Sequence, residues 1–225
     1  MLDSRGILGK HRKDLFMRRA EFVQKWRMCQ ISNGEELDRD VETALRGADA
    51  VIALSKPGPG TLKPEWIKGM AQDPIVFAAA NPIPEIWPWE AKEAGAAVVA
   101  TGRSDFPNQV NNSLGFPGIF RGTLDVRATT ITDEMAIAAA ESLAGMAVEK
   151  GLTPDYLLPT MEEWEVFPRE AAAVAMKAQE QGVALRQTTY EEEYARAEKM
   201  IRASREMTQL LMEEGFIPEA PEADE

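Results

Sequence analysis

The segment Ala96-Ala-Val-Val-Ala-Thr-Gly-Arg-Ser-Asp-Phe-Pro-Asn-Gln-Val-Asn-Asn-Ser-Leu-Gly-Phe-Pro-Gly118 joins an apolar run to a long polar stretch. The run consists of β-branched and small residues, which is typical of a buried parallel strand. It ends at Thr101-Gly102, and a stretch rich in amide side chains follows. In open α/β sheets, ligands bind beyond the carboxyl ends of the strands, so this stretch is a candidate ligand loop. An ordinary turn is the alternative, because Asn, Gly and Pro are also turn residues.

Two more apolar runs precede this segment. Residues 50–54 predict a buried strand that leads into Ser55-Lys-Pro-Gly-Pro-Gly60, and residues 75–80 predict another that ends at Asn81-Pro82. Pro82 cannot continue a central strand, and it biases Asn81 to an extended conformation. With a third strand near 97–101, the runs predict a parallel α/β sheet. We expect the loops 81–86 and 102–116 to lie at one common edge of it.

Composition restricts the class of protein. The chain has 225 residues, of which 44% are hydrophobic, enough for a domain with a full core. No apolar run approaches the roughly 18 residues of a membrane span, and no signal peptide is visible. The single Cys29 excludes an internal disulfide framework and suits a reducing cytoplasm. The lack of a long apolar run predicts no membrane partner. The single His11 argues against a histidine-based metal site or a Ser-His-Asp triad.

Charge is unevenly distributed along the chain. The net charge of −12 argues against a nucleic-acid partner. Residues 1–28 nevertheless hold eight Lys or Arg against three acidic residues. A basic beginning suits a phosphate-bearing ligand, and a solvated helix face is the alternative.

Three segments resemble the malic enzyme family in its small prokaryotic form. They are 48–58, 75–85 and 100–112, the last with Phe116-Pro-Gly118 after it, and they occur in the family's order and spacing. The similarity extends from about Leu2 to about Ala184. The resemblance identifies the chain as the carboxyl-terminal, NAD(P)-binding half of such an enzyme. It implies a Rossmann-like parallel sheet, amino-terminally truncated and followed by carboxyl-terminal helices.

The expected organisation has three parts. The resemblance implies a partial NAD(P)-binding domain over 1–184, then a carboxyl-terminal helix over 185–214 and an acidic tail over 215–225. Apolar residues at helical spacing over 190–214 predict packing against the core, with a surface for a partner helix as the alternative. The acidic, Pro-containing tail predicts disorder. Helices are also predicted over 11–30, 132–150 and 168–181, and the polar loop after the third strand is expected to give way to helix after Gly118.

The resemblance also implies the site residues. Asn81 and Asn112 match substrate-binding amides, with Asn112 directed at the malate carboxylate and Asn81 at malate or the nicotinamide. Asn111 matches a residue that supports the loop and the cofactor. Asp3 matches the acidic residue that holds the adenosine ribose, for which a plain turn aspartate is the alternative. Ser55 lies in the loop on the nicotinamide side.

The reaction of the family requires more than these residues. Malic enzymes oxidise malate with NAD or NADP, then use Mg or Mn to decarboxylate the product to pyruvate and CO2. The family's catalytic Lys and Tyr, acidic metal ligands and glycine-rich loop have no match here, so no catalytic and no metal-binding residue is assigned. We therefore expect no turnover by this chain alone, and a partner that is either the amino-terminal malic enzyme half or a second copy.

Alternatives to this interpretation stay open. One alternative is an NAD(P)-binding or vestigial partner module without catalysis. Another is an unrelated α/β oxidoreductase or binding domain whose loops carry similar amides by convergence. Asp3 favours NAD, because a carboxylate repels the 2′-phosphate of NADP. Arg5, Arg12 and the pair Arg18-Arg19 could offset that repulsion.

Overall fold

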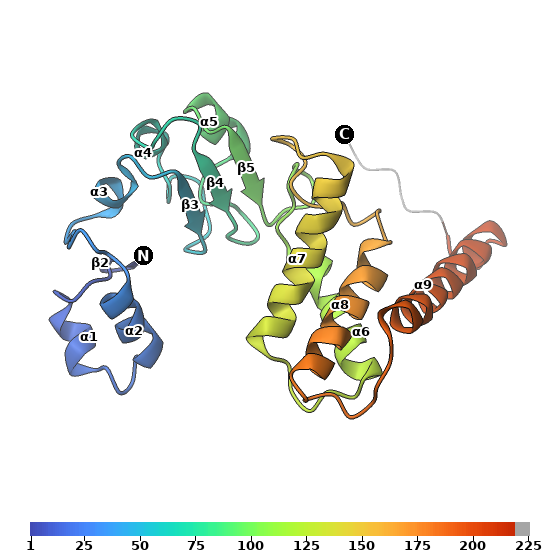
Figure 1. Cartoon of the computed structure of the whole chain (residues 1–225). Helices are drawn as coiled ribbons and strands as arrows, with labels where there is room; N and C mark the ends of the chain where they lie inside the picture. Colours follow the sequence, from blue (N-terminus) through green and yellow to red (C-terminus); the bar gives the residue numbers. More distant parts are fainter. Residues whose placement is uncertain (219–225) are drawn as a thin grey trace. The chain divides into compact units, whose positions relative to one another are not determined.

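The structure is a computed structural model that describes residues 1–218. The chain forms two compact units, Met1–Gln109 and Val110–Glu225, and each is described by itself (Figure 1). Their boundary lies well before residue 184, where the family resemblance ends. The predicted domain ranges therefore stay a prediction.

A three-stranded parallel sheet forms the centre of the first unit. Its strands are β3 (Ala50–Ala53), β4 (Ile75–Ala78) and β5 (Val98–Thr101), in the order β3-β4-β5. The register pairs Ala53 with Ala78 and Ala78 with Thr101, so the three strands end at the same level. The predicted α/β class and parallel sheet are confirmed.

Three short helices accompany these strands: the first precedes β3, and the other two connect successive strands. They are α3 (Val41–Leu45), α4 (Pro64–Lys68) and α5 (Pro88–Glu93) (Figure 1). The last two begin with Pro, whose fixed φ suits a first helical turn. Leu45, Ile67 and Ala91 pack with Val76 and Val99 in the hydrophobic core of this unit. The core thus lies on one face of the sheet.

On the opposite face of the sheet the side chains of β3 are exposed, whereas Ala100 of β5, in register with Phe77 and Ile52, is buried. Ile52 is 68% exposed and Leu54 is 78% exposed. Among the residues that the structure describes, β3 pairs with β4 alone. The prediction of a buried strand over 50–54 is wrong, because alternate side chains of β3 point away from the covering helices.

The amino-terminal segment is a hairpin followed by two short helices. β1 (Leu2–Asp3) pairs antiparallel with β2 (Gly6–Ile7), and α1 (Lys13–Met17) and α2 (Val23–Ile31) follow. The prediction of one helix over 11–30 is wrong. Leu15 and Cys29 belong to one buried cluster with Leu8. In a straight helix these two residues would lie about 21 Å apart, so the break between α1 and α2 is what lets both reach the cluster.

Four helices build the second unit as far as it is described: α6 (Asn112–Asp125), α7 (Asp133–Lys150), α8 (Val166–Glu180) and α9 (Tyr190–Glu213). The buried side of α8 is rich in alanine and packs closely against α6. A Cβ atom on Gly122 of α6 would lie 2.3 Å from the Ala171 carbonyl oxygen of α8. Glycine at this position is therefore what permits the close approach of the two backbones.

The start of α6 corrects the predicted loop over 102–116. The helix begins at Asn112 and includes Pro117, whereas the sequence predicted helix only after Gly118. Pro and Gly lower helix propensity, which is why the segment was expected to be irregular. Two features outweigh that propensity: Asn111 caps the helix, and Gly118 and Gly122 allow burial against α8.

The end of the chain also differs from expectation. The range of α9 matches the predicted helix, but only Glu193 and Ala197 of α9 are buried. Met207 is 61% exposed and Leu210 is 56% exposed. The predicted core packing is therefore wrong for the carboxyl-terminal half of α9. Residues 219–225, most of the predicted tail, lie outside the described residues. No helix within residues 1–218 is long and apolar enough to cross a membrane.

Candidate functional site

The carboxyl ends of β3, β4 and β5 bring three loops to one edge of the sheet. Ser55 and Ala80 each lie two residues beyond the last paired residues of their strands, Ala53 and Ala78. In parallel sheets this edge is where ligands bind. It is the place in the first unit where predicted site residues gather.

Glu85 closes this edge from the inside. Its side chain is fully buried. One carboxylate oxygen accepts hydrogen bonds from the Ser55 backbone N–H at 2.7 Å and from the Ser55 hydroxyl at 2.9 Å. The other oxygen accepts one from the Ala80 N–H at 3.0 Å. A single side chain thus satisfies backbone donors that two strands leave unpaired where they end.

No role was predicted for Glu85 from the sequence. The available signal was its position: it is the only carboxylate in Asn81-Pro-Ile-Pro-Glu85, a segment that follows one predicted strand and cannot itself continue it. The contact with Ser55, which lies 30 residues earlier, could not be predicted from this position alone. It requires knowing that the Glu85 side chain is buried.

The loop that contains Asn81 and Glu85 is also bonded to both of its neighbours. On the side of β3, Gly58 N–H donates to Ile83 O at 3.2 Å and Leu62 N–H donates to Glu85 O at 3.0 Å. On the side of β5, the Arg103 guanidinium donates to Pro82 O at 3.1 Å. The middle loop is therefore fixed from two directions.

The loop after β5 contains a structural amide. Asn108 is buried, and its side-chain NH2 donates to Val99 O at 3.0 Å. Its backbone carbonyl accepts from Thr101 N–H at 3.3 Å. Arg103 also pairs with Asp105 at 2.7 Å. Part of the amide-rich stretch thus holds the loop against β5.

Two predicted cofactor residues, Ser55 and Asn81, lie at this edge. Both are exposed, and the peptide bond between Asn81 and Pro82 is cis. Because the Ser55 hydroxyl donates its hydrogen to Glu85, it retains only acceptor capacity for a ligand. Asn81 follows Ala80 directly, so its position depends on the same Glu85 contact.

Asp3 lies in the hairpin, and its carboxylate is already engaged. One oxygen accepts from the Arg5 N–H at 2.9 Å and from Arg12 at 2.9 Å; the other accepts from Lys25 at 3.1 Å and from Arg12 at 3.4 Å. Burial opposes ionisation of Asp3, but the hydrogen bonds from Arg12, Arg5 and Lys25 outweigh it and lower the pKa to about 2. These four bonds use the roughly four lone-pair positions of a carboxylate.

Asn111 and Asn112 belong to the second unit, at the start of α6. Asn111 is the N-cap, and its side-chain oxygen accepts from the Ser113 N–H at 2.9 Å. Asn112 is the first residue of the helix and is exposed. That these residues share an edge with Asn81 stays a prediction, as do the assigned roles of all five residues.

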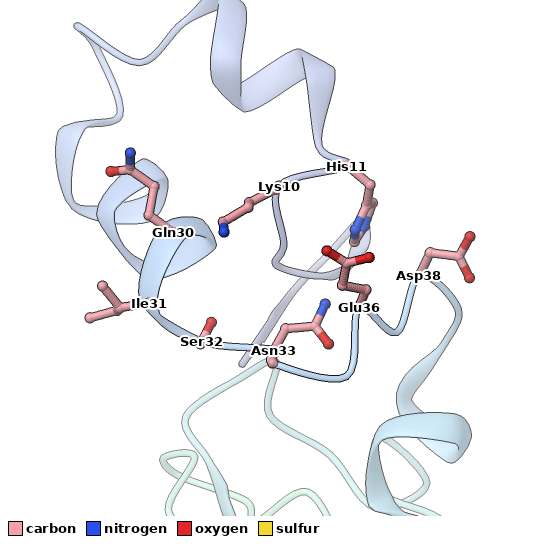
Figure 2. Close-up of a pocket in the computed structure, with 9 residues that line it drawn as sticks. Lys10, His11, Gln30, Ile31, Ser32, Asn33, Glu36 and Asp38 are labelled. Carbon is pink, nitrogen blue, oxygen red and sulfur yellow. The ribbon is translucent and has the colours of Figure 1, made fainter.

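A separate polar hollow of about 270 Å³ lies in the amino-terminal segment (Figure 2). Lys10 and His11 line it from the loop before α1, and Asn33 and Glu36 line it from the loop after α2. Ligand pockets have predominantly apolar walls with a few polar groups. This hollow is mostly polar and includes no predicted site residue, so we assign no function to it.

No metal centre is found in the described part of the chain. Residues 1–218 contain no group of three His, Cys, Asp or Glu that could hold a metal ion. Glu163, from the acidic cluster 162–165, instead accepts hydrogen bonds from Lys150 and Tyr156.

Comparison with known proteins places these observations in a family. The family described as "Malic enzyme, NAD binding domain" matches residues 1–179. The bifunctional malic/malolactic enzyme of Bacillus subtilis is 51% identical over 157 residues, and the NADP-dependent malic enzyme of Halomonas elongata is 41% identical over 204. A crystal structure of Entamoeba histolytica malic enzyme is 50% identical, superposes with a TM-score of 0.95 and covers 98% of this chain.

The chain spans less than half the length of the proteins it matches. It covers 38% of the Bacillus enzyme, 45% of the Halomonas enzyme and 45% of the Entamoeba chain. These matches cover 70% and 83% of this chain for the two curated relatives. The similarity to this part of such enzymes confirms the predicted family and the Rossmann-like α/β fold.

Proposed function

Because the chain belongs to the malic enzyme NAD-binding domain family, we propose that it forms the cofactor-binding part of an enzyme that converts malate to pyruvate and CO2. The observation that carries this proposal is the strand-end edge, where Glu85 joins the loops of Ser55 and Asn81. That edge is where α/β sheets bind dinucleotides.

The residues at this edge suit the nicotinamide end of a dinucleotide. A carboxamide such as that of Asn81 both donates and accepts hydrogen bonds, and it adds no charge next to the ring. Ser55 offers an acceptor oxygen beside it. When bound, the cofactor supplies the hydride acceptor for malate. In this proposal Ser55 and Asn81 orient its ring, with malate as the alternative ligand of Asn81. Asn112 binds the malate carboxylate and Asn111 supports its loop and the cofactor.

The Asp3 cluster bears on the choice between NAD and NADP. A ribose hydroxyl that donates to Asp3 has to displace one of the groups that already donate to this carboxylate. Lys25 is more exposed than Arg12, with 46% of its side chain accessible, so Lys25 is the donor to be displaced. Arg12 and Lys25 also neutralise the carboxylate, which weakens its repulsion of a 2′-phosphate. This arrangement supports the use of NADP as well as NAD.

The described residues do not fit the divalent metal that the family uses. With no group of three candidate ligands in residues 1–218, we derive no step through a metal ion from this chain. The decarboxylation half of the reaction, with its Mg or Mn, is assigned to the remaining part of the complete enzyme. This chain alone then binds cofactor without turnover.

The exposed apolar side chains of β3 support a partner. Ile52 and Leu54 are large, apolar and mostly exposed, and exposed apolar patches mark interaction sites. The outer edge of β3 offers backbone groups for a further strand. We propose that another part of a malic enzyme packs here, with a second copy of the chain as the other candidate.

Two measurements test the proposed function. Trp87 and Trp89 directly follow the Asn81 loop and stack on each other, so energy transfer from tryptophan to reduced nicotinamide reports binding. We expect saturable transfer with NADH or NADPH, and no cofactor reduction when malate and Mn²⁺ are added to the chain alone. Turnover should appear when the chain is joined to the amino-terminal portion of a similar malic enzyme.

Two results would change this assignment. Absence of binding with both reduced cofactors would remove the cofactor role. Binding without turnover in the joined protein would favour the module that binds NAD(P) but does not take part in catalysis.

A further inference from the structure

The geometry points to a specific role for Glu85. We propose that Glu85 is a positioning residue of the cofactor site, which fixes the loops of Ser55 and Asn81 in the arrangement that receives the nicotinamide end of NAD(P). The inference rests on the proposed function. Glu85 acts through its neighbours, since it is fully buried and does not reach the surface of the edge.

The hydrogen bonds at the ends of β3 and β4 show where Glu85 replaces backbone acceptors. The parallel ladder between β3 and β4 continues as far as Ala79, whose N–H donates to Ala53 O at 3.0 Å. The next residue, Ala80, has its N–H turned to the other side of the strand, and it donates to Glu85 at 3.0 Å. On the neighbouring strand the Ser55 N–H donates to Glu85 at 2.7 Å. One carboxylate thus ends both strands, with one oxygen for each.

This contact also sets directions. A carboxylate only accepts hydrogen bonds, so the three donors on Ser55 and Ala80 must all point toward it. The Ser55 oxygen then keeps acceptor capacity for a ligand. Asn81 begins where the fixed Ala80 ends. Both Ser55 and Asn81 are exposed, although the group that anchors their loops is not.

Filling the space would not require a carboxylate. An apolar side chain of similar volume would bury this site at a lower desolvation cost than a charged group. A carboxylate is suited to the position because it gathers N–H and O–H donors from two separate loops. We therefore infer organisation of the edge, rather than burial alone, as the contribution of Glu85.

The test compares three variants of the full chain by tryptophan-to-NADH energy transfer, at temperatures where each is folded. Glu85→Gln keeps the size of the side chain but replaces one acceptor oxygen with a donor that faces an N–H group. Glu85→Asp keeps two acceptor oxygens on a shorter side chain. Ile67→Ala is the matched control, because Ile67 is 1% exposed in the core of the same unit but is not a residue of either loop.

We expect Glu85→Gln to weaken NADH binding by about tenfold, Glu85→Asp to weaken it less, and Ile67→Ala to leave it unchanged. A merely structural role would instead make affinity follow stability, so that Ile67→Ala weakened binding as much as Glu85→Gln. That result would overturn the proposal, as would failure of both Glu85 variants to fold. If the unmodified chain bound neither NADH nor NADPH, the proposed function would fail, and this inference with it.

Discussion

The sheet edge of the first unit and the α6–α8 contact of the second unit each bury a glutamate completely, with opposite surroundings. Glu85 accepts three hydrogen bonds from Ser55 and Ala80. Neither carboxylate oxygen of Glu170 on α8 has a partner in the structure, and burial raises the pKa of Glu170 to about 9. The side chain of Glu170 lies instead against Gly118 of α6.

The difference teaches how to interpret a buried charge. A carboxylate surrounded by donors organises the groups that donate to it. A buried carboxyl group without donors keeps its proton, because burial disfavours the charged form. Only the first kind marks an edge where loops are held in one arrangement, and in this chain that edge carries Ser55 and Asn81. The following predictions test this contrast.

A large effect on the free energy of unfolding is expected for Glu85→Gln. The side-chain NH2 group of the new Gln would point at N–H or O–H groups that now donate to Glu85. One or two of these groups would then be left without an acceptor. At about 1–3 kcal/mol for each, the free energy of unfolding should fall by about 3 kcal/mol. Urea denaturation followed by tryptophan fluorescence measures it. A loss below about 1 kcal/mol would mean that the three hydrogen bonds do not hold the edge.

Gly122→Ala tests the close packing that surrounds Glu170. The added methyl group would lie 2.3 Å from Ala171 O and 2.9 Å from Val174 Cβ, so α6 and α8 must separate. We expect a loss of about 2–3 kcal/mol of unfolding free energy by thermal or urea denaturation.

Gly145→Ala is the matched control for this change. Gly145 is also inside a helix of the same unit, but an added Cβ meets nothing within 4 Å. Because alanine has the higher helix propensity, this substitution should raise the free energy of unfolding by about 0.5–1 kcal/mol. Equal effects of the two substitutions would contradict the close α6–α8 contact.

Glu170→Gln should change how stability depends on pH. The folded pKa of about 9 lies above the reference value of 4.5, so between these values the folded chain holds a proton that the unfolded chain has lost. The free energy of unfolding therefore falls as pH rises through this window, by up to about 1.4 kcal/mol per pH unit from this group. Gln cannot ionise, so the stability of the variant relative to the unmodified chain should increase from pH 5 to 9. If the two proteins instead showed parallel curves of unfolding free energy against pH, Glu170 would be ionised in the fold.

The smallest effects on stability are expected at the Asn111–Asn112 pair. Asn111→Ala removes the cap of α6 and should cost about 1 kcal/mol, whereas Asn112→Ala should change stability by less than about 0.5 kcal/mol. In a complete enzyme, Asn112→Ala should weaken malate binding by about one to two decades. Unaltered malate affinity together with a large stability loss would make Asn112 a structural residue.

The contrast between Glu85 and Glu170 also shows what the sequence could and could not predict. The three strands and α7 follow from local signals: apolar runs in the strands, and the cap at Thr132 in α7. Likewise, the position of Asn81 follows from Pro82 after a strand. These features depend on residues that are close together in the sequence.

The remaining features depend on contacts between distant residues. Asn112–Gly118 has the composition of a loop, and it is helical because Gly118 and Gly122 meet α8 some 50 residues later. The contact between Glu85 and Ser55 spans 30 residues. The exposure of Ile52 and Leu54 depends on which face of the sheet the helices cover. Periodicity alone does not contain this information.

The central claim is that the ends of β3 and β4, held together by Glu85, form the cofactor-binding edge. Hydrogen exchange of the full chain with and without saturating NADH or NADPH tests it most directly. We predict slower exchange in the segments 55–62 and 81–86, with no change along α9, where most side chains are exposed. Binding that left both segments unaltered, or that slowed exchange only elsewhere, would contradict the account.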